Sequence, residues 1–447
     1  MKRTRPPRPP IDVLLVSERP LWPPQHGFAR HGSEIAKSLL AGGWSVRIAT
    51  VERPAKRPPG PLARRWRAWP EASKQDIAAG HQGWAGAAAL LRKKLAAHQG
   101  VEPEQAAGLI PLVRRYQPRA VVAFGPHGAM LLASLSAEKD RPVLAWYAAD
   151  EPASFYASCL RREPAARWPG LTRQMAVFAG IQAVFGPKLD LVVGVSPTDT
   201  HRLARLSRPT DSVTIRNGVD LEAFRPARTP VKAPIVGFWG NQDFAPNADA
   251  VSWFIAKVWP QVRAEQPKAE LRILGPGGST KLRKRAKARG VTWVGFAPDL
   301  PTELRKLSSA VVPTRCGLGI KNKLLEAAAM GLPTLASPTA VRGLVFEPQR
   351  SPVTLCRTPR DWTRSLVDVL ARPDAARMQG MAARRWVEQR HSWMNAASRL
   401  AWALEQAEAR LAGRTPAVPA VRSDSAPLPM PAPLTAKPTP TPGRHAA

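Results

Sequence analysis

The segment 317–331, GLGIKNKLLEAAAMG, combines residue types that suit anion binding. Gly317 and Gly319 allow a close backbone approach and unusual φ values, and a helix is expected to begin just after them. The unpaired amides of a first helical turn, together with the helix dipole, attract negative charge. Lys321 and Lys323 add point charges that suit phosphate. These residues predict a site for a phosphate-bearing ligand in front of the helix.

Glu326 is the single acid in this segment. It is expected about one turn inside the helix, where a carboxylate can accept hydrogen bonds from the two hydroxyls of a ribose. A nucleoside diphosphate would then satisfy both ends of the segment. The alternative is a tight turn with solvated lysines, in which Glu326 bridges Asn322 or Lys323 along the helix. The loop alone does not decide between them, because it matches neither a P-loop nor GxGxxG.

Further candidates follow strand-like runs in the first half of the chain. Gly27 lies in PPQHGFARH and His127 in FGPHGAM. The alternative for each is an ordinary loop residue without a role in catalysis. Asp150 and Glu151 end another apolar run, where acids can face a ligand cleft or cap the next helix. Capping is slightly favoured for this pair.

Neither a metal nor a bound cofactor is expected. The chain has no HExxH, no Cys/His cluster, no Ser-His-Asp arrangement and no DxD. His26 and His31 are expected to be exposed loop or helix-start residues. The three cysteines, Cys159, Cys316 and Cys356, form no CxxC pair, and their odd number argues against a disulfide framework. A reducing compartment fits them best.

These residues are positioned by alternating strand-like and helix-like segments, the pattern of parallel sheets. The expected strands cover residues 11–17, 45–51, 119–125, 141–150, 189–196, 212–220, 234–240, 269–275, 291–296, 309–314 and 333–338. The expected helices cover residues 33–43, 247–265, 279–290 and the start of the next helix after 321, with two more within 360–411. The Pro-punctuated stretch 224–233 is read as a linker between two α/β halves. The basic region 53–112 is mostly helical in pattern and is left unplaced.

The composition sets limits on partners and compartment. The 447 residues contain 66 Lys+Arg against 33 Asp+Glu, a formal net charge of +33. Such a charge attracts any polyanion, but nucleic acid is not favoured because no binding motif is present. The basic residues of 281–289 are read as a solvated face, with contact to anionic lipid as the alternative. The run IDVLLV is too short for a signal peptide, so a cytoplasmic location is expected, with peripheral membrane contact left open.

The segment GIKNKLLEAAAMGLPTLAS resembles the nucleotide-sugar motif of the retaining GT-B glycosyltransferases of the group-1, GT4-like family. Other resembling segments occur in the family's order: SERPLWPPQHGFARHGSEIAKSLLAGGWSVRIAT, DLVVGVSPTDTHRL with VTIRNGVDLEAFRP, GFWGNQDFAPNADAVSWF and VGFAPDLPTELRKLSSAVVPT. The resemblance covers about residues 11–400. It implies two Rossmann-like parallel-sheet domains that face a central cleft, with a C-terminal helix that crosses back to the first domain.

The resemblance also implies domain bounds. A basic tail at 1–10 precedes an acceptor domain at 11–223. A nucleotide-sugar domain at 224–385 follows, then a crossover helix at 386–411. The Pro-rich tail at 412–447 is expected to be disordered because it lacks apolar residues to bury.

A donor site is implied by the same resemblance. A nucleotide-diphosphate sugar would bind Gly240, Gly295, Gly317, Gly319, Ile320, Lys321, Lys323 and Glu326. The acceptor, a glycan, a lipid-linked or another hydroxyl compound, would bind near Gly27 and His127, which are the implied catalytic positions. The reaction would be a metal-free hexosyl transfer, retaining at the sugar, in envelope or exopolysaccharide synthesis.

Two departures from the family pattern keep another interpretation open. The first of the family's two glutamates falls on Leu318, and FWGNQDFAPN lacks the usual Arg and Lys after the first strand of the second domain. Lys321 and Lys323 are therefore expected to neutralise the diphosphate, with Lys321 preferred. The alternative is a catalytically altered GT-B-like protein that binds nucleotides or polyanions. Trp239 is expected to be a core residue.

Overall fold

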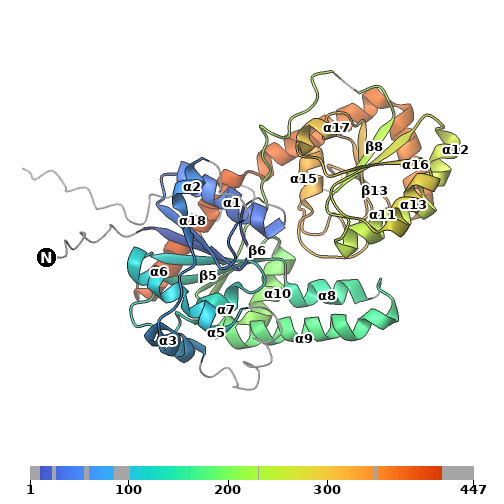
Figure 1. Ribbon diagram of the computed structural model, residues 1–447. Coiled ribbons are helices and arrows are strands. Elements are labelled where there is room, and N and C mark those ends of the chain that lie inside the picture. Colours follow the sequence, from blue (N-terminus) through green and yellow to red (C-terminus); the bar gives the residue numbers. More distant parts are fainter. Residues whose placement is uncertain are drawn as a thin grey trace, which may run out of the picture.

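The chain folds into two parallel-sheet domains with helices packed against both sheets (Figure 1). The structure is a computed structural model, and it describes residues 11–22, 27–54, 60–84, 101–160, 162–229, 231–346 and 351–414. Both predicted tails lie largely outside the described residues. The predicted class, two Rossmann-like domains, is confirmed.

The N-terminal domain contains a seven-stranded sheet in the order β3-β2-β1-β4-β5-β6-β7, with every pairing parallel. Its strands are β1 (Val13–Ser17), β2 (Val46–Thr50), β3 (Trp66–Ala68), β4 (Ala120–Phe124), β5 (Val143–Ala149), β6 (Leu191–Gly194) and β7 (Asp211–Thr214). The runs VLLVS, AVVAF and VLAWYAA are buried throughout. Continuous apolar strands are expected when helices cover both faces of a parallel sheet.

Nine α-helices are described in this domain: α1 (Gly27–Ala41), α2 (Pro61–Arg65), α3 (Lys74–Trp84), α5 (Pro103–Ala107), α6 (Leu109–Tyr116), α7 (Gly128–Ala133), α8 (Pro152–Leu160), α9 (Trp168–Phe185) and α10 (Pro197–Ser207). Helix α1 begins at Gly27, six residues earlier than predicted. The unplaced region supplies α2, α3, α5 and α6, and also β3, which extends the sheet beyond β2. The sequence analysis missed that strand and the antiparallel pair α8–α9, which projects toward the second domain (Figure 1).

The C-terminal domain contains a six-stranded parallel sheet in the order β10-β9-β8-β11-β12-β13. Its strands are β8 (Ile235–Trp239), β9 (Glu270–Leu274), β10 (Val291–Gly295), β11 (Ser309–Val312), β12 (Thr334–Ala336) and β13 (Thr354–Leu355). Its helices are α11 (Ala245–Lys257), α12 (Trp259–Glu265), α13 (Thr280–Ala288), α14 (Leu300–Leu304), α15 (Asn322–Ala329), α16 (Pro359–Ala371) and α17 (Pro373–Arg390). The single helix predicted for 247–265 is divided, because Pro260 has no N–H to continue α11 and instead fits the first turn of α12.

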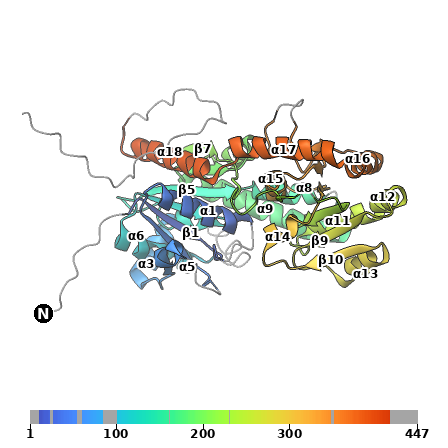
Figure 2. The ribbon, with the colours of Figure 1, turned by 90° about the horizontal axis from the view of Figure 1, so that it is seen from above.

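The crossover helix differs from its predicted bounds. Helix α17 packs on α15 and runs to Arg390, so the predicted boundary at 385/386 falls inside a helix of the C-terminal domain. The helix that returns is α18 (Trp393–Leu411), which packs on α1, β5 and β6 (Figure 2). Leu400 and Leu404 are fully buried in this contact. Three helices therefore occupy 359–411, where two were predicted.

The two segments that connect the domains contact each other. Asn217 and Gly218 follow β7, and His391 lies between α17 and α18. His391 Nδ1 is 2.8 Å from the Asn217 carbonyl oxygen. A Cβ on Gly218 would collide with the backbone of Trp393, so only glycine fits where the two connecting segments meet. Burial lowers the pKa of His391 to about 4, which keeps the imidazole neutral there.

Candidate active site

Three adjacent strands of the C-terminal domain end in glycines with positive φ. Gly240, Gly275 and Gly295 follow or end β8, β9 and β10, with φ values of 133°, 115° and 78°. The Gly275 N–H donates to the Gly295 carbonyl, at 2.6 Å. Ligands of open parallel sheets bind at the carboxyl ends of the strands. The structure therefore places predicted Gly240 and Gly295 on one edge of the sheet.

The loop 313–321, named here the donor loop, joins β11 to α15 at the same edge. Gly317 and Gly319 have φ values of 99° and 70°, in the left-handed region that favours glycine. Leu318 and Ile320 between and after them are buried. Ile320 lies beside Gly343, where a Cβ would come within 3.3 Å of Ile320 Cγ1. The two glycines let the loop turn while its apolar side chains anchor it.

Lys323 points to the glycine edge of the sheet. Its Nζ donates to Asn247 Oδ1 at 2.7 Å and lies 4.1 Å from the centroid of the Phe238 ring. A Cβ on Gly240 would be 3.4 Å from the same nitrogen. Burial lowers the pKa of Lys323 to about 7, because desolvation disfavours the ammonium form.

Lys321 turns back over the donor loop toward the N-terminal domain. Its Nζ donates to the carbonyls of Leu318 and Gly319, the second at 3.1 Å. Burial lowers the pKa of Lys321, and the carboxylates of Asp150 and Asp199 oppose that shift. The two lysines thus point in different directions, Lys323 to the glycine edge of the second sheet and Lys321 back over its own loop.

Glu326 is buried on α15 and is held by two donors. Trp239 Nε1 donates to Glu326 Oε2 at 2.6 Å, and Arg30 of α1 forms an ion pair with Oε1. The alternative partners considered from the sequence, Asn322 and Lys323, bond elsewhere, to Asn217 and Asn247. Glu326 therefore presents its carboxylate toward the N-terminal domain.

Asp150 and Glu151 take different positions, although the sequence treated them as a pair. Glu151 caps α8 by accepting from the N–H groups of Ala153 and Ser154 at 2.8 and 2.7 Å. Asp150 faces the donor loop so closely that a Cβ on Gly319 would overlap its Oδ1. Burial raises the pKa of Asp150 to about 7.

Helix α8 closes the interface on the other side of the donor loop. The Gly317 N–H donates to Ser158 Oγ at 2.9 Å. Phe155 stacks on Phe244 of the C-terminal domain, with centroids 5.8 Å apart. Side chains of α1, α8 and the end of β5 therefore all contact the segment 317–326.

His127 and Gly27 lie at the carboxyl edge of the N-terminal sheet. His127 Nδ1 is hydrogen-bonded to Glu18, which follows β1, and its ring stacks on Phe178. Gly27 is the exposed first residue of α1, three positions before Arg30. The next residue, Phe28, is 3.7 Å from a Cβ built on Gly125, which directly follows β4. The structure thus brings Gly27 and His127, the two residues predicted for the acceptor side, into one neighbourhood.

His31 differs from its expected environment, and Arg315 is paired with Asp249. His31 is buried between Tyr147 and Trp393, and burial lowers its pKa to about 4. The prediction of an exposed histidine is wrong, because α18 covers this face of α1. Arg315, the nearest other cation in the donor loop, pairs with Asp249 through two nitrogens and turns away from Glu326.

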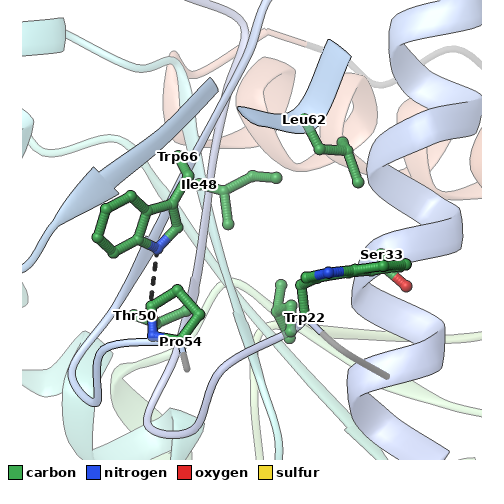
Figure 3. A pocket seen from close by; sticks show the side chains of 8 residues that line it. Trp22, Ser33, Ile48, Thr50, Pro54, Leu62 and Trp66 are labelled. Carbon is green, nitrogen blue, oxygen red and sulfur yellow. Dashed lines mark hydrogen bonds between the residues drawn. The ribbon is translucent and has the colours of Figure 1, made fainter. Parts of the chain in front are cut away.

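An apolar pocket lies on the N-terminal domain, away from the donor loop (Figure 3). In this view Trp66 donates its indole N–H to Thr50, at 3.3 Å. The lining residues come from α1, α2, β2, β3 and the segments between them: Leu21, Trp22, Ser33, Ile48, Thr50, Pro54, Leu62 and Trp66. Neither Gly27 nor His127 lines this pocket.

The assembled site can bind an anion and a diol next to each other. Loop amides and two lysines suit a diphosphate, and Glu326 suits paired hydroxyls. The sequence analysis missed Arg30, Glu18 and the role of Trp239, since their partners are hundreds of residues away or in another element. Of these contacts, only the one made by Trp239 had a signal in the sequence, because a buried indole N–H needs a hydrogen-bond partner. Within the described residues, no group of three or more His, Cys, Asp or Glu could hold a metal.

Residues 233–372, which carry β8 to α16 and the whole donor loop, match the sequence profile of the family "Glycosyl transferases group 1". The search of curated proteins found no match. Residues 233–372 are thus similar to group-1 glycosyltransferases, and the two-domain fold is the GT-B fold of the solved glycosyltransferase structures described next.

Several solved structures share this fold at low sequence identity. Sucrose-phosphate synthase from Thermosynechococcus elongatus is 16% identical, with a TM-score of 0.66, covering 90% of this chain and 99% of that chain. WaaG, a glycosyltransferase involved in lipopolysaccharide biosynthesis, is 14% identical, with a TM-score of 0.57 and coverages of 90% and 100%. Anabaena HepE, in complex with UDP and glucose, is 11% identical, with a TM-score of 0.59 and coverages of 88% and 99%. None of the helices in the described part of the chain has the length and apolar run that a membrane span needs.

Proposed function

We propose that this protein transfers a sugar from a nucleoside-diphosphate donor to a hydroxyl acceptor, with retention of configuration at the sugar. The observation that carries the proposal is the position of Glu326. Its carboxylate is buried one turn inside α15, behind a glycine loop with two inward-pointing lysines. A nucleoside diphosphate suits this arrangement, because it offers negative charge to the loop and paired hydroxyls to the carboxylate.

In this proposal each element of the site has one task. The ribose hydroxyls displace the Arg30 guanidinium from Glu326, and Trp239 continues to hold the other carboxylate oxygen. The amides of Gly317 and Gly319 receive the diphosphate. Lys323 adds charge on the side of β8 and Lys321 on the side of the N-terminal domain. Gly295, which ends β10, has open space where a side chain would be and leaves room for the rest of the nucleotide.

The acceptor is proposed to bind the N-terminal domain, between α1 and the loop that carries His127. Its hydroxyl oxygen forms a bond to the anomeric carbon on the face from which the diphosphate leaves. The bond from that carbon to the phosphate oxygen breaks, and the hydroxyl proton passes to the leaving phosphate. Loop amides and lysines stabilise the charge that develops on this group. Closure of the domains excludes water from the reaction.

Two known structures suggest which ligands to test first. HepE is described with UDP and with UDP-glucose, and WaaG acts in lipopolysaccharide biosynthesis. We propose a uridine-diphosphate hexose as the first donor and a cell-envelope glycan or lipid-linked sugar as the first acceptor. Work at the cytoplasmic face of a membrane would suit such an acceptor and the charge of +33.

A second candidate function is nucleotide binding without transfer. Position 318 carries a leucine where the resemblance implies a glutamate, so no carboxylate at this position can hold a sugar hydroxyl. The Leu318 side chain is instead buried, at 8% exposure. A protein with leucine in place of this glutamate would bind the nucleoside diphosphate without recognising the sugar.

Calorimetry with UDP, GDP and ADP, followed by the corresponding nucleotide sugars, separates the two candidates. The proposed transferase binds one nucleoside diphosphate and slowly hydrolyses or transfers the sugar of the matching donor. Binding of the nucleotide without any release of sugar across a panel of acceptors supports the second candidate. Absence of all nucleotide binding overturns both.

A further inference from the structure

Two of the three cysteines meet where the N-terminal domain packs on the donor loop. Cys159 lies near the end of α8, and Cys316 directly precedes Gly317. Their thiols are near enough to shift each other's pKa, and both residues are buried, at 5% and 4% exposure. Cys356 lies in the core of the C-terminal domain, beside β13.

The neighbouring residues hold the two cysteines together. The residue before Cys159 accepts a hydrogen bond from the residue after Cys316, since Ser158 Oγ and the Gly317 nitrogen are 2.9 Å apart. A disulfide requires Cβ atoms within about 4.5 Å of each other. The Cys159 sulfur lies 3.8 Å from the same Ser158 hydroxyl, so the two cysteines flank one contact between α8 and the donor loop.

The surroundings give the two thiols different reactivities. The neighbouring Cys316 and, less strongly, the Ser158 hydroxyl lower the pKa of Cys159, against the opposing effect of burial. The neighbouring Cys159 and burial raise the pKa of Cys316. The thiolate is the nucleophile in thiol–disulfide exchange, so Cys159 reacts first and Cys316 second.

We propose that Cys159 and Cys316 form a reversible disulfide that fastens α8 to the donor loop. The oxidant is a low-molecular-weight disulfide such as oxidised glutathione. The Cys159 thiolate attacks one sulfur of the oxidant, and the first small thiolate leaves and takes a proton. Cys316 then loses its proton, attacks the Cys159 sulfur and releases the second small thiol. Two protein thiols are oxidised by two electrons, and the oxidant is reduced to two thiols.

The disulfide would control the donor site, and this consequence rests on the proposed function. It fixes Ser158 on the Gly317 amide, which the diphosphate is proposed to use. It also holds α8 and the donor loop in contact, so the domains cannot separate to admit a nucleotide. Reduction of the disulfide frees the Gly317 amide and lets the two domains separate again.

The modification is tested on the full chain without reference to catalysis. Reduced protein is equilibrated in glutathione buffers of increasing potential, alkylated and digested. Mass spectrometry is expected to find a Cys159–Cys316 cross-linked peptide and a fully alkylated Cys356. The matched variants are Cys159→Ser and Cys316→Ser, which abolish the cross-link, and Cys356→Ser, which leaves it unchanged.

Three results would overturn the proposal. They are stable glutathione adducts without the cross-link, a cross-link that includes Cys356, and cross-links between molecules only. The effect on the site is measured as nucleoside-diphosphate affinity before and after oxidation. We expect a loss of about tenfold or more, because an amide–phosphate bond is withheld. The loss should reverse with dithiothreitol and be absent in Cys316→Ser.

The two hypotheses fail in different ways. If the proposed function is wrong, reduced and oxidised protein both fail to bind nucleotides, while the cross-link still forms. If the disulfide is wrong, nucleotide binding persists and is independent of the glutathione potential. A cross-link that leaves nucleotide affinity intact overturns the control of the donor site.

Discussion

Arg30 of α1 and Glu326 of α15 form an ion pair that joins the two domains. The Glu326 side chain is 5% exposed and that of Arg30 is 34% exposed. In the proposed function, the guanidinium occupies the position that the ribose takes. A ligand that displaces it can use a carboxylate that is already desolvated and oriented by Trp239.

Replacement of Glu326 is expected to remove ribose recognition. Loss of a charge-assisted bond to the ribose costs about 1.5–3 kcal/mol, so Glu326→Gln should bind the nucleoside diphosphate about 10- to 150-fold more weakly. The check is calorimetry with the nucleotide and its 2′,3′-dideoxy form. Wild type should prefer the ribonucleotide, and the variant should not discriminate. Equal affinities for the ribonucleotide in both proteins would disprove the assignment.

Replacement of Arg30 is expected to increase the affinity for the free nucleoside. In Arg30→Met the ribose no longer displaces a guanidinium, so nucleoside affinity should rise by an amount of about 1 kcal/mol or less, the usual scale of a partly exposed ion pair. The melting temperature should change little. A fall in nucleoside affinity would mean that Arg30 itself contacts the ligand.

Lys323 is expected to couple nucleotide binding to pH. Its pKa of about 7 leaves it mostly neutral at pH 8 in the free protein. A bound diphosphate favours the ammonium form and raises that pKa, so binding at pH 8 takes up a proton and weakens as the pH rises above 7. Calorimetry in buffers of different ionisation enthalpy measures this uptake.

The matched lysine variants give the control for that measurement. Lys323→Met should abolish proton uptake, whereas Lys284→Met, at an exposed position of α13, should leave it unchanged. In Lys321→Ala, Lys323→Ala and the double variant, the advantage of the diphosphate over the nucleoside should shrink stepwise. If that advantage survives in the double variant, neither lysine contacts phosphate.

Helix α18 is expected to be essential to the stability of the N-terminal domain. Leu404→Ala should lower the free energy of unfolding by about 2–5 kcal/mol, because the side chain is fully buried. Leu411→Ala, at a side chain that is 44% exposed, should cost less than about 0.5 kcal/mol. A chain ending at Arg414 should keep its melting temperature, and one ending at Ser392 should not. Denaturant titration measures the free energy of unfolding of the two leucine variants, and thermal unfolding measures the melting temperature of the two shortened chains.

The sequence predicted the strands well and the side-chain partners poorly. Runs such as VLLVS and AVVAF are apolar along their whole length, so the hydrophobic pattern is sufficient to place them. Strand β3 has three residues, and its position next to β2 depends on tertiary pairing. Helix α1 begins earlier than its pattern suggests, because its first turn buries only the small Ala29 in the core and otherwise carries the exposed Gly27 and Arg30, which pairs with Glu326.

At the candidate site the sequence predicted the donor loop but not what faces it. Gly317, Gly319 and Glu326 are signalled by local spacing, since backbone φ and helix position are local properties. Arg30 and Asp150 approach from another domain, and no local pattern reports such contacts. The odd number of cysteines argued against a disulfide framework, but it does not exclude one exchangeable pair across the interface.

The return of α18 to the first domain has a consequence for synthesis on the ribosome. Helix α1 and strands β5 and β6 are complete once residue 194 has been made, yet the helix that covers them is the last one described in the chain. The growing chain must carry this uncovered apolar face while the second domain is translated and folds. Binding by chaperones during translation should therefore persist until residues 393–411 leave the exit tunnel.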